Sequence, residues 1–361
     1  MTEDLIERLQ LARSPGIGPV TYRQLMARFG SASAALAAIP DLAARGGGRA
    51  PRLCSRSDAE REIGRVDKLG ARYLVLGQGL YPRLLAELDD APPLLIAKGA
   101  VGLLGRQCIA IVGARNASAA ACRFARGLAH ELGQEDVVVV SGLARGIDSA
   151  AHDGALESGT VGVVAGGIDI FYPPENQARQ EALFERGLVV AEMSPGTEPR
   201  ARHFPYRNRI IAGLSVGTIV VEAAPRSGSL ITARLAAEAG REVMAVPGSP
   251  LDPRAQGCNL LIRDGATLIQ NAADVLEALR PMQRHVASPR SDYQTEPRWL
   301  DGDQDALGLI EELLGPSPVP VDEIIRLSGV PSGAVQMALL ELDLAGRLDR
   351  HAGNKVSLKG A

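Results

Sequence analysis

Short apolar stretches alternate with turns of glycine, serine or proline in the middle of the chain, between Cys108 and Pro250. Each stretch is about as long as an ordinary strand, and neighbouring residues within it are apolar, so both faces of the strand are expected to be buried. The stretches are residues 109–112, 137–140, 161–164, 188–190, 218–221 and 242–246. This pattern is typical of a parallel sheet.

Longer amphipathic patterns at residues 119–132 and 230–239 predict helices between these strands. Strands that are buried on both faces and alternate with helices form a sheet covered on both sides, and right-handed crossovers bring the strand-to-helix turns to one edge. We therefore predict an α/β domain built on a doubly wound parallel sheet. Its ligand is expected at the carboxyl edge of the strands.

The N-terminal residues have a helical pattern with one distinctive turn. Short helices are predicted within residues 5–39, and the connection from Ser14 to Pro19 has the sequence Ser-Pro-Gly-Ile-Gly-Pro. This is typical of a helix-hairpin-helix unit, whose turn presents backbone N–H groups to a phosphate. The same turn also joins helices in domains that never bind DNA, so both interpretations stay open.

The hydrophobic pattern disappears after Met282 and returns near Asp305, which predicts a linker at residues 283–303. Three apolar helical patterns and two short strands follow, as in a winged-helix domain. These segments are residues 307–314, 321–327, 334–344, 347–350 and 355–358. The predicted domains are residues 1–65, 66–282 and 304–361.

The third helix of this last domain is poorly suited to DNA. Residues 332–345 contain no lysine or arginine but contain Glu341 and Asp343, which phosphates would repel. We expect this domain to contact protein or to act in autoregulation rather than to recognise duplex DNA, with a minor DNA contact left open. Four cations of the domain lie in the predicted wing: Arg347, Arg350, Lys355 and Lys359.

The composition of the chain excludes several classes of protein. A net charge of -3 over 361 residues gives no general attraction to polyanions, so a nucleic-acid surface requires local clusters of cations. No apolar run is long enough to span a membrane, and the acids among the first ten residues are unlike a secretory leader, which predicts a cytoplasmic protein without membrane insertion. Scattered cysteines and histidines predict neither a metal site nor a disulfide framework.

The first two predicted strands lead into turns that combine backbone N–H groups with arginine. Gly113, Ala114 and Arg115 follow the first strand, and a helix begins at Ser118 or the next residue. The spacing differs from GxGxxG and the chain has no Gly-Lys pair, which excludes a dinucleotide fingerprint and a Walker A loop. An anion site without ATP hydrolysis is therefore predicted.

The turn at residues 141–148 places two glycines around Arg145 and ends at Asp148, the predicted N-cap of the next helix. His152 lies one helical turn further on. It either forms an acid/base pair with Asp148 or is satisfied by its own helix cap, and we favour the second interpretation because no nucleophile stands nearby in the sequence. Tyr172 and Tyr206 either stack on a base or pack under a loop.

The densest cationic segment precedes the fifth strand, and it contains no acid: Arg200, Arg202, His203, Arg207 and Arg209. Arginine suits phosphate because its planar fork binds bidentately and stays charged. Glu222 ends the fifth strand, and we expect it to hold an arginine rather than to act as a base. The turn Ser227-Gly228-Ser229 then offers free N–H groups at a helix start.

Seven motifs occur in a fixed order: IVGAR, SGLARGIDSAAHDGAL, YPPEN, FPYRNRIIAGLS, VVEA, SGSLITA and VPG. In this combination, over residues 80–269, the chain resembles the DprA/Smf family of DNA-processing proteins. The resemblance implies an extended Rossmann-like sheet between an N-terminal SAM or helix-hairpin-helix-like domain and a C-terminal winged helix. It also implies a homodimeric recombination mediator, without catalytic residues or cofactor, that binds and protects single-stranded DNA, acts beside single-strand-binding protein and loads RecA in natural transformation.

The resemblance assigns phosphate contacts to Arg115 after the first strand and to residues of two later motifs. Where the family commonly has a lysine, this chain has Gln177, and Arg179 is the candidate substitute. With the turns described above, the predicted DNA site consists of Gly113, Arg115, Ser118, Arg145, Asn176, Arg179, Arg207, Asn208, Arg209, Ser227, Gly228 and Ser229. The implied dimer interface consists of Asn259, Leu261, Ile262 and Leu268, whose apolar stripe is equally compatible with a core.

Two other functions are compatible with parts of this sequence. A nucleotide-processing enzyme of the phosphoribohydrolase kind also combines such a sheet with arginine, glutamate and a Gly/Ser loop, but its PGGxGT signature is missing. A transcription factor acting through the winged helix is disfavoured by the cation-poor third helix. We therefore predict a non-enzymatic protein that binds single-stranded DNA.

Overall fold

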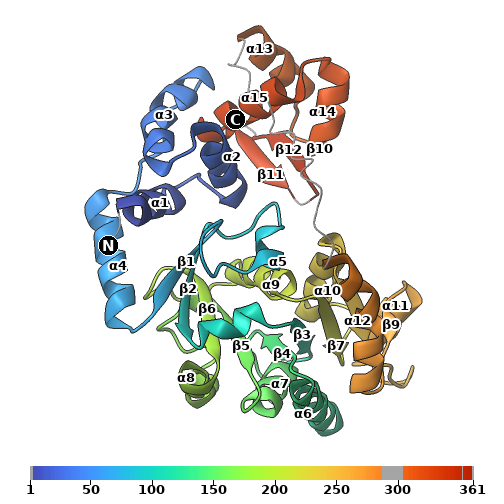
Figure 1. The fold of residues 1–361 in the computed structure, drawn as a ribbon. Coiled ribbons are helices and arrows are strands. Elements are labelled where there is room, and N and C mark those ends of the chain that lie inside the picture. Colours follow the sequence, from blue (N-terminus) through green and yellow to red (C-terminus); the bar gives the residue numbers. More distant parts are fainter. Residues whose placement is uncertain (1–2, 287–303, 352, 360–361) are drawn as a thin grey trace. The chain divides into compact units, whose positions relative to one another are not determined.

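The computed structural model describes residues 3–286, 304–351 and 353–359. It divides into two compact units, one made of Met1–Ile63 with Arg290–Ala361 and the other of Gly64–Pro289 (Figure 1). Most of the predicted linker, residues 287–303, lies outside the described residues, and residues 283–286 belong to helix α12 (Ala272–Val286). The exact domain boundaries stay a prediction.

Within the described residues, the second unit contains a nine-stranded sheet with the order β1-β2-β6-β5-β4-β3-β7-β8-β9. Strands β3 to β9 pair in parallel, and β2 is antiparallel to both β1 and β6. The six predicted strands are β3 to β8, which confirms the α/β class. The strands are β1 (Arg72–Val75), β2 (Leu94–Gly99), β3 (Cys108–Gly113), β4 (Val138–Ser141), β5 (Thr160–Gly167), β6 (Leu188–Met193), β7 (Gly217–Val221), β8 (Glu242–Ala245) and β9 (Thr267–Leu268).

Strands β1, β2 and β9 were not predicted. β1 has only four residues, one of them buried, and β9 has two, so neither has a readable periodicity. β2 follows Pro92-Pro93, and its first four residues are buried, with Leu95 and Ile96 in hydrophobic clusters on opposite faces of the sheet. Its pairing depends on tertiary contacts that the local sequence does not contain.

Helices cover both faces of the sheet, as predicted (Figure 1). Alternate strand residues point to opposite faces, so Ala110 packs with α5, α9 and α10, whereas Ile111 packs with α6, α7 and α12. Leu183 of α8 packs against β6 on the second face. The remaining bounds are α4 (Arg56–Lys68), α5 (Arg83–Ala86), η1 (Val101–Gly105), α6 (Ala119–Gln134), α7 (Ile147–Ala155), η2 (Pro174–Asn176), α8 (Gln177–Arg186), α9 (His203–Leu214), α10 (Gly228–Glu238) and α11 (Gln256–Arg263).

The strand order reverses between β3 and β7, because the chain builds β4, β5 and β6 on one side of β3 and β7, β8 and β9 on the other. Such a switch point opens a crevice at the carboxyl edge. Gly113 lies there. A Cβ atom on Gly113 would lie 2.0 Å from the carbonyl oxygen of Val221 and 2.6 Å from Ile147, so only glycine allows these elements to meet.

The first unit contains N-terminal helices and a winged-helix fold, both as predicted. The short connection from Ser14 to Gly18 joins α1 to α2. The C-terminal part combines three helices with a three-stranded sheet of order β10-β12-β11. The bounds are α1 (Glu3–Arg13), α2 (Pro19–Phe29), α3 (Ala32–Arg45), α13 (Gln304–Leu313), β10 (Val319–Pro320), α14 (Val321–Ser328), α15 (Ser332–Leu344), β11 (Leu348–His351) and β12 (Lys355–Leu358). None of the helices in the described ranges is long and apolar enough to cross a membrane.

Candidate functional site

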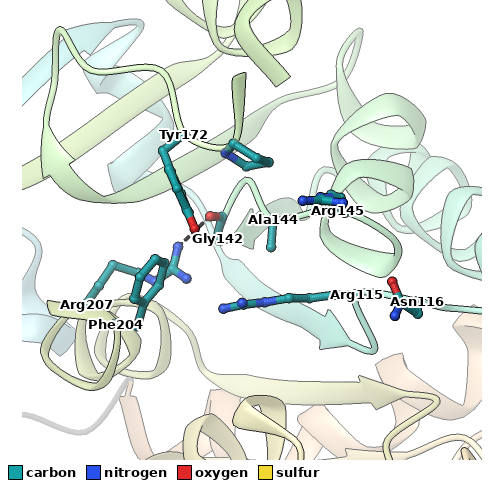
Figure 2. Close-up of a pocket in the computed structure, with 9 residues that line it drawn as sticks. Arg115, Asn116, Gly142, Ala144, Arg145, Tyr172, Phe204 and Arg207 are labelled. Atoms are coloured by element: carbon teal, nitrogen blue, oxygen red, sulfur yellow. Dashed lines mark hydrogen bonds between the residues drawn. The ribbon is translucent and has the colours of Figure 1, made fainter. Parts of the chain in front are cut away.

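A pocket of about 290 Å³ opens at the carboxyl edge of the sheet, beyond β3, β4 and β5 and beside the start of α9 (Figure 2). Three of the predicted arginines and one predicted tyrosine face it. Its lining residues are Arg115, Asn116, Gly142, Ala144, Arg145, Tyr172, Pro173, Phe204 and Arg207. The pocket therefore combines cationic and aromatic side chains from four separate parts of the chain.

Arg207 forms the buried base of this pocket. Its Nη1 donates to the carbonyl oxygens of Gly142 and Val163, the latter at 2.7 Å, and its Nε donates to Asn208 Oδ1 at 3.1 Å. Burial lowers the pKa of Arg207 to about 10, although the Asp148 carboxylate opposes that shift, so the guanidinium remains protonated at neutral pH. It supplies a fixed positive charge at a place from which water is largely excluded.

Arg115 is exposed and extends over the aromatic part of the pocket (Figure 2). Its guanidinium carbon lies 5.3 Å from the centroid of the Phe204 ring, and that of Arg207 lies 5.8 Å from the same ring. The Tyr172 and Phe204 centroids are 5.8 Å apart, and Tyr172 is 49% exposed. Cation–π contact orients both arginines. The exposed Arg115 keeps its N–H groups available for an anion, whereas Nη1 and Nε of Arg207 already donate to protein oxygens.

Arg145 lies at the rim, with a side chain that is 63% exposed and an ion pair to Glu175 at 3.2 Å. The turn that carries it depends on Gly146, which has φ +73 and lies against the β3 turn; a Cβ there would be 2.2 Å from the carbonyl oxygen of Ala114. The Asp148 carboxylate accepts from the N–H groups of Gly142 and Ala144 at 3.2 and 3.3 Å. These contacts fix the turn relative to β3.

Two predictions about this turn are wrong. Gly146, not Asp148, is the N-cap of α7, and Asp148 lies inside the first helical turn. His152 bonds neither Asp148 nor a helix cap; its Nδ1 lies 2.7 Å from Oγ1 of Thr160 on β5. Because Thr160 donates its proton to the Val139 carbonyl, Nδ1 must be the donor to Thr160, and burial lowers the pKa of His152 to about 3. His152 is a neutral core residue.

Asn176 and Arg179 lie beside the pocket and bond each other. Arg179 donates to both carboxylate oxygens of Asp153, at 2.7 and 3.0 Å, and to Asn176 Oδ1. Asn176 in turn donates to the Leu143 carbonyl at 2.7 Å, while Gln177 is exposed and donates to Glu181. Neither Asn176 nor Arg179 lines the pocket, so their contact with DNA stays a prediction.

Arg209 and Asn208 have different surroundings from Arg207, although they are its neighbours on α9. Arg209 is buried and donates to both oxygens of Glu192, at 2.7 and 2.8 Å, away from the pocket lining. Asn208 lies between Arg207 and the start of α10, where its Nδ2 is 3.5 Å from the Gly228 carbonyl. Arg209 thus anchors α9, and its predicted contact with DNA is not tested.

The helix starts on either side of the switch point are already occupied in part by protein groups. The Ser118 N–H donates to Glu222 Oε2 at 2.7 Å, and Ser118 Oγ accepts from Ala121 N–H. Glu222 also lies 3.7 Å from Arg254 Nε, in keeping with the expectation that it holds an arginine. Ser227 and Ser229 share a hydroxyl bond of 2.7 Å at the start of α10, and Gly228 beside them faces open space.

Phe204, Asn116 and Pro173 line the pocket but were missed. A signal existed for Phe204, since it lies three residues before Arg207 on the same helix and so on the same face. Of the two predicted tyrosines, Tyr172 lines the pocket, whereas Tyr206 is 55% exposed elsewhere on α9.

The predicted dimer residues lie around α11 and β9. Asn259 bonds both ways to the backbone of Gly248, at 3.1 and 2.9 Å, and Leu261 and Ile262 are half-buried against the core. Leu268 is 45% exposed.

In the described part of the chain, no three His, Cys, Asp or Glu side chains gather as metal ligands would.

Family models match the chain in three segments. The model for "DNA recombination-mediator protein A" matches residues 72–280, the DprA-like N-terminal HHH domain matches residues 2–64, and the DprA winged helix domain matches residues 294–354. The chain belongs to the DprA/Smf family. The first of these segments contains every residue of the pocket and all seven motifs that suggested the resemblance.

Relatives of this family are similar over much of their length. The DNA processing protein DprA of Streptococcus pneumoniae is 47% identical over 198 residues, which cover 54% of this chain and 70% of that protein. Protein Smf of Escherichia coli is 37% identical over 288 residues, 78% of this chain and 76% of its own. These values are typical of a shared fold.

Two solved structures of family members also match. The crystal structure of DprA from S. pneumoniae aligns with a TM-score of 0.64 and 36% identity, covering 77% of this chain and 98% of that one. DNA processing protein A from Helicobacter pylori, described for its single-stranded DNA binding mode, aligns with a TM-score of 0.53 and 29% identity, covering 58% of this chain and 97% of that one. The DprA-type architecture is therefore common to this chain and both proteins.

Proposed function

We propose that this protein binds single-stranded DNA along the carboxyl edge of its sheet, as a recombination mediator and not as an enzyme. The observation that carries the proposal is the pocket in which Arg115 and Arg207 flank Phe204, with Tyr172 facing the same ring. Arginine binds phosphate in a sequence-independent way, and an exposed aromatic ring stacks on any base. Such a site holds an unpaired strand without altering it.

The description of the H. pylori relative supports this proposal, because that protein has a single-stranded DNA binding mode. Of the predicted residues, we propose that Arg115, Arg145 and Arg207 contact the strand, and that Gly113 and Asn208 hold the turns that carry them. Ser118, Ser227, Gly228 and Ser229 extend the same edge. The strand is then delivered to RecA by a cytoplasmic homodimer that acts beside single-strand-binding protein.

The alternative of a phosphoribohydrolase-like enzyme requires a free carboxylate at the site. Glu222 instead accepts the Ser118 N–H and lies beside Arg254, and it does not line the pocket. Release of free base from a nucleoside monophosphate would revive that alternative.

A salt titration tests the proposal. Fluorescence anisotropy would follow binding of a labelled oligothymidine and of a duplex of equal length between low and moderate salt. If about four phosphates are neutralised by each protomer, the plot of log K against log salt has a slope near -3. Preference for the duplex, or affinity that is independent of salt, would contradict the proposal.

A further inference from the structure

The third helix of the winged-helix domain is enclosed on two sides. A winged helix that recognises duplex DNA places this helix in the major groove, which requires an exposed face. Here Val335 and Leu339 of α15 belong to the core of their own domain, while Met337, Leu340 and Leu344 belong to the core of the N-terminal helices. α15 therefore packs into two hydrophobic cores at once.

The acidic residues that make α15 unsuitable for DNA have partners in the N-terminal helices. Asp343 Oδ2 accepts from Thr21 Oγ1 at 2.7 Å, and the Glu341 carboxylate pairs with Arg45 at 2.9 Å. Glu341 is 2% exposed. Burial raises the pKa of Glu341, whereas Arg45 and Arg28 lower it. These carboxylates bind Thr21 of α2 and Arg45 of α3.

Two arginines that were predicted to lie on the wing also contact the N-terminal helical domain. Arg350 donates to Asp343 at 2.9 Å and to Gln24 Oε1 at 3.0 Å. Arg347 pairs with Glu311 and also donates to the Gly46 carbonyl at 3.3 Å. Each arginine therefore pairs with an acid of its own domain and also donates a hydrogen bond to the N-terminal domain.

The end of α3 approaches α15 at the distance of direct backbone contact. A Cβ atom on Gly46 would lie 2.1 Å from the carbonyl oxygen of Glu341 and 2.9 Å from Cβ of Ala345. One on Gly48 would lie 2.4 Å from the carbonyl oxygen of Ala345. Such contact requires complementary surfaces, because one methyl group would separate them.

We propose that the winged-helix domain is a protein-docking domain whose α15 face binds the N-terminal helical domain of the same chain. Apolar side chains and the carboxylates of Glu341 and Asp343 contribute to that face, and Arg347 and Arg350 add contacts beside it. α15 cannot enter a major groove while the face is covered. The proposal is independent of the single-stranded DNA site, which belongs to the other unit. The N-terminal and C-terminal domains then act as one body.

Cleavage of the native chain tests this proposal. A protease recognition sequence is placed within residues 287–303, where the sequence predicts a linker, and the cut protein is analysed by size-exclusion chromatography. We expect the fragment from residue 304 onward to co-elute with the rest of the wild-type chain. In Gly46→Ala the fragment should dissociate at least tenfold more readily, whereas Gly308→Ala, in open space on α13, should retain it. Release from the wild type, or equal retention in both variants, would overturn the proposal.

A second variant and a competitor complete the experiment. Thr21→Val removes the bond to Asp343 without changing side-chain shape, and should weaken retention about three- to tenfold even if Gly46→Ala fails to fold, which circular dichroism would reveal. Unchanged retention in Thr21→Val would count against the assigned contact. Duplex DNA added to the cut protein should not release the fragment. Release by duplex DNA would mean that α15 recognises DNA in competition with the N-terminal domain.

Discussion

Two arginines of the pocket have the same charge but opposite surroundings. Arg115 is exposed and lies over the Phe204 ring. Arg207 is 6% exposed and holds the carbonyl groups of Gly142 and Val163. A group that is fixed by buried hydrogen bonds contributes to folding as well as to binding, because its removal leaves those carbonyls unpaired.

We therefore expect Arg115→Ala to weaken binding of single-stranded DNA about tenfold or more without changing thermal stability, and Arg207→Ala to lower both affinity and stability. Anisotropy with an oligothymidine and thermal unfolding, measured on the same samples, separate the two effects. Arg234→Ala is the matched control, since its side chain is 67% exposed on α10 and does not line the pocket. Full affinity in Arg115→Ala would remove that residue from the site.

His152 makes the free energy of unfolding of the protein depend on pH. Burial, followed by Arg179, lowers the pKa of His152 to about 3 from 6.5, so between these values the unfolded chain binds a proton that the folded chain does not. Stability therefore rises with pH through this window and is lost as the pH falls below about 6.5, by up to ~1.4 kcal/mol per pH unit.

The variant His152→Gln, which can still donate to Thr160, should lack this contribution. Urea unfolding at several pH values between 4 and 7 would reveal it as a shallower dependence in the variant than in the wild type. Parallel curves would show that His152 titrates in the folded protein as freely as in the unfolded one. Carboxylates that titrate in the same range are present in both proteins, so their contribution to the pH dependence cancels in the comparison.

At the level of elements, the sequence predicts best what depends on continuous local pattern. Strands β3 to β8, helices α6 and α10, and the three helices and hairpin of the winged helix all follow from runs of apolar residues with a clear period, whereas the two-residue strand β10 does not. β1 and β2 were missed because β2 is defined by its pairing with β6, and β1 by its pairing with β2. Local sequence does not specify that antiparallel neighbour.

The start of α7 shows why a local rule can fail. Asp148 is a good N-cap by residue type, but the close approach of the β3 and β4 turns requires Gly146 in a left-handed conformation, and the helix begins directly after it. Asp148 then binds the turn from inside the helix. Likewise, the partner of His152 is on a neighbouring strand, where reasoning from helical spacing could not find it.

At the scale of the whole molecule, the sheet topology assembles the pocket. Arg115, Arg145, Tyr172 and Arg207 follow four different strands, and parallel strands bring all four to one edge. This grouping was predictable from strand order alone. The packing of α15 on α2 and α3 was not, because it joins segments about three hundred residues apart through side chains that also suit an ordinary winged-helix core.

The proposed homodimer depends on the edge of the nine-stranded sheet that is formed by β9. β9 is the outermost strand beyond β8 in the described part of the chain, and Leu268 on it is 45% exposed. An uncovered edge strand with an exposed leucine favours pairing with a second copy. We expect Leu268→Glu to shift the protein from dimer to monomer, because a buried interface would have to desolvate the new carboxylate.

Light scattering over a range of protein concentrations measures this shift, with Leu309→Glu as control, since Leu309 is 40% exposed on α13 in the other unit. The pocket is built from one chain, so a short oligothymidine should bind the monomeric variant with unchanged affinity. A long strand that occupies both protomers should lose affinity, because the second contact is no longer intramolecular. A wild-type protein that is monomeric at tens of micromolar, or a Leu268→Glu variant that stays dimeric, would place the interface elsewhere or remove it.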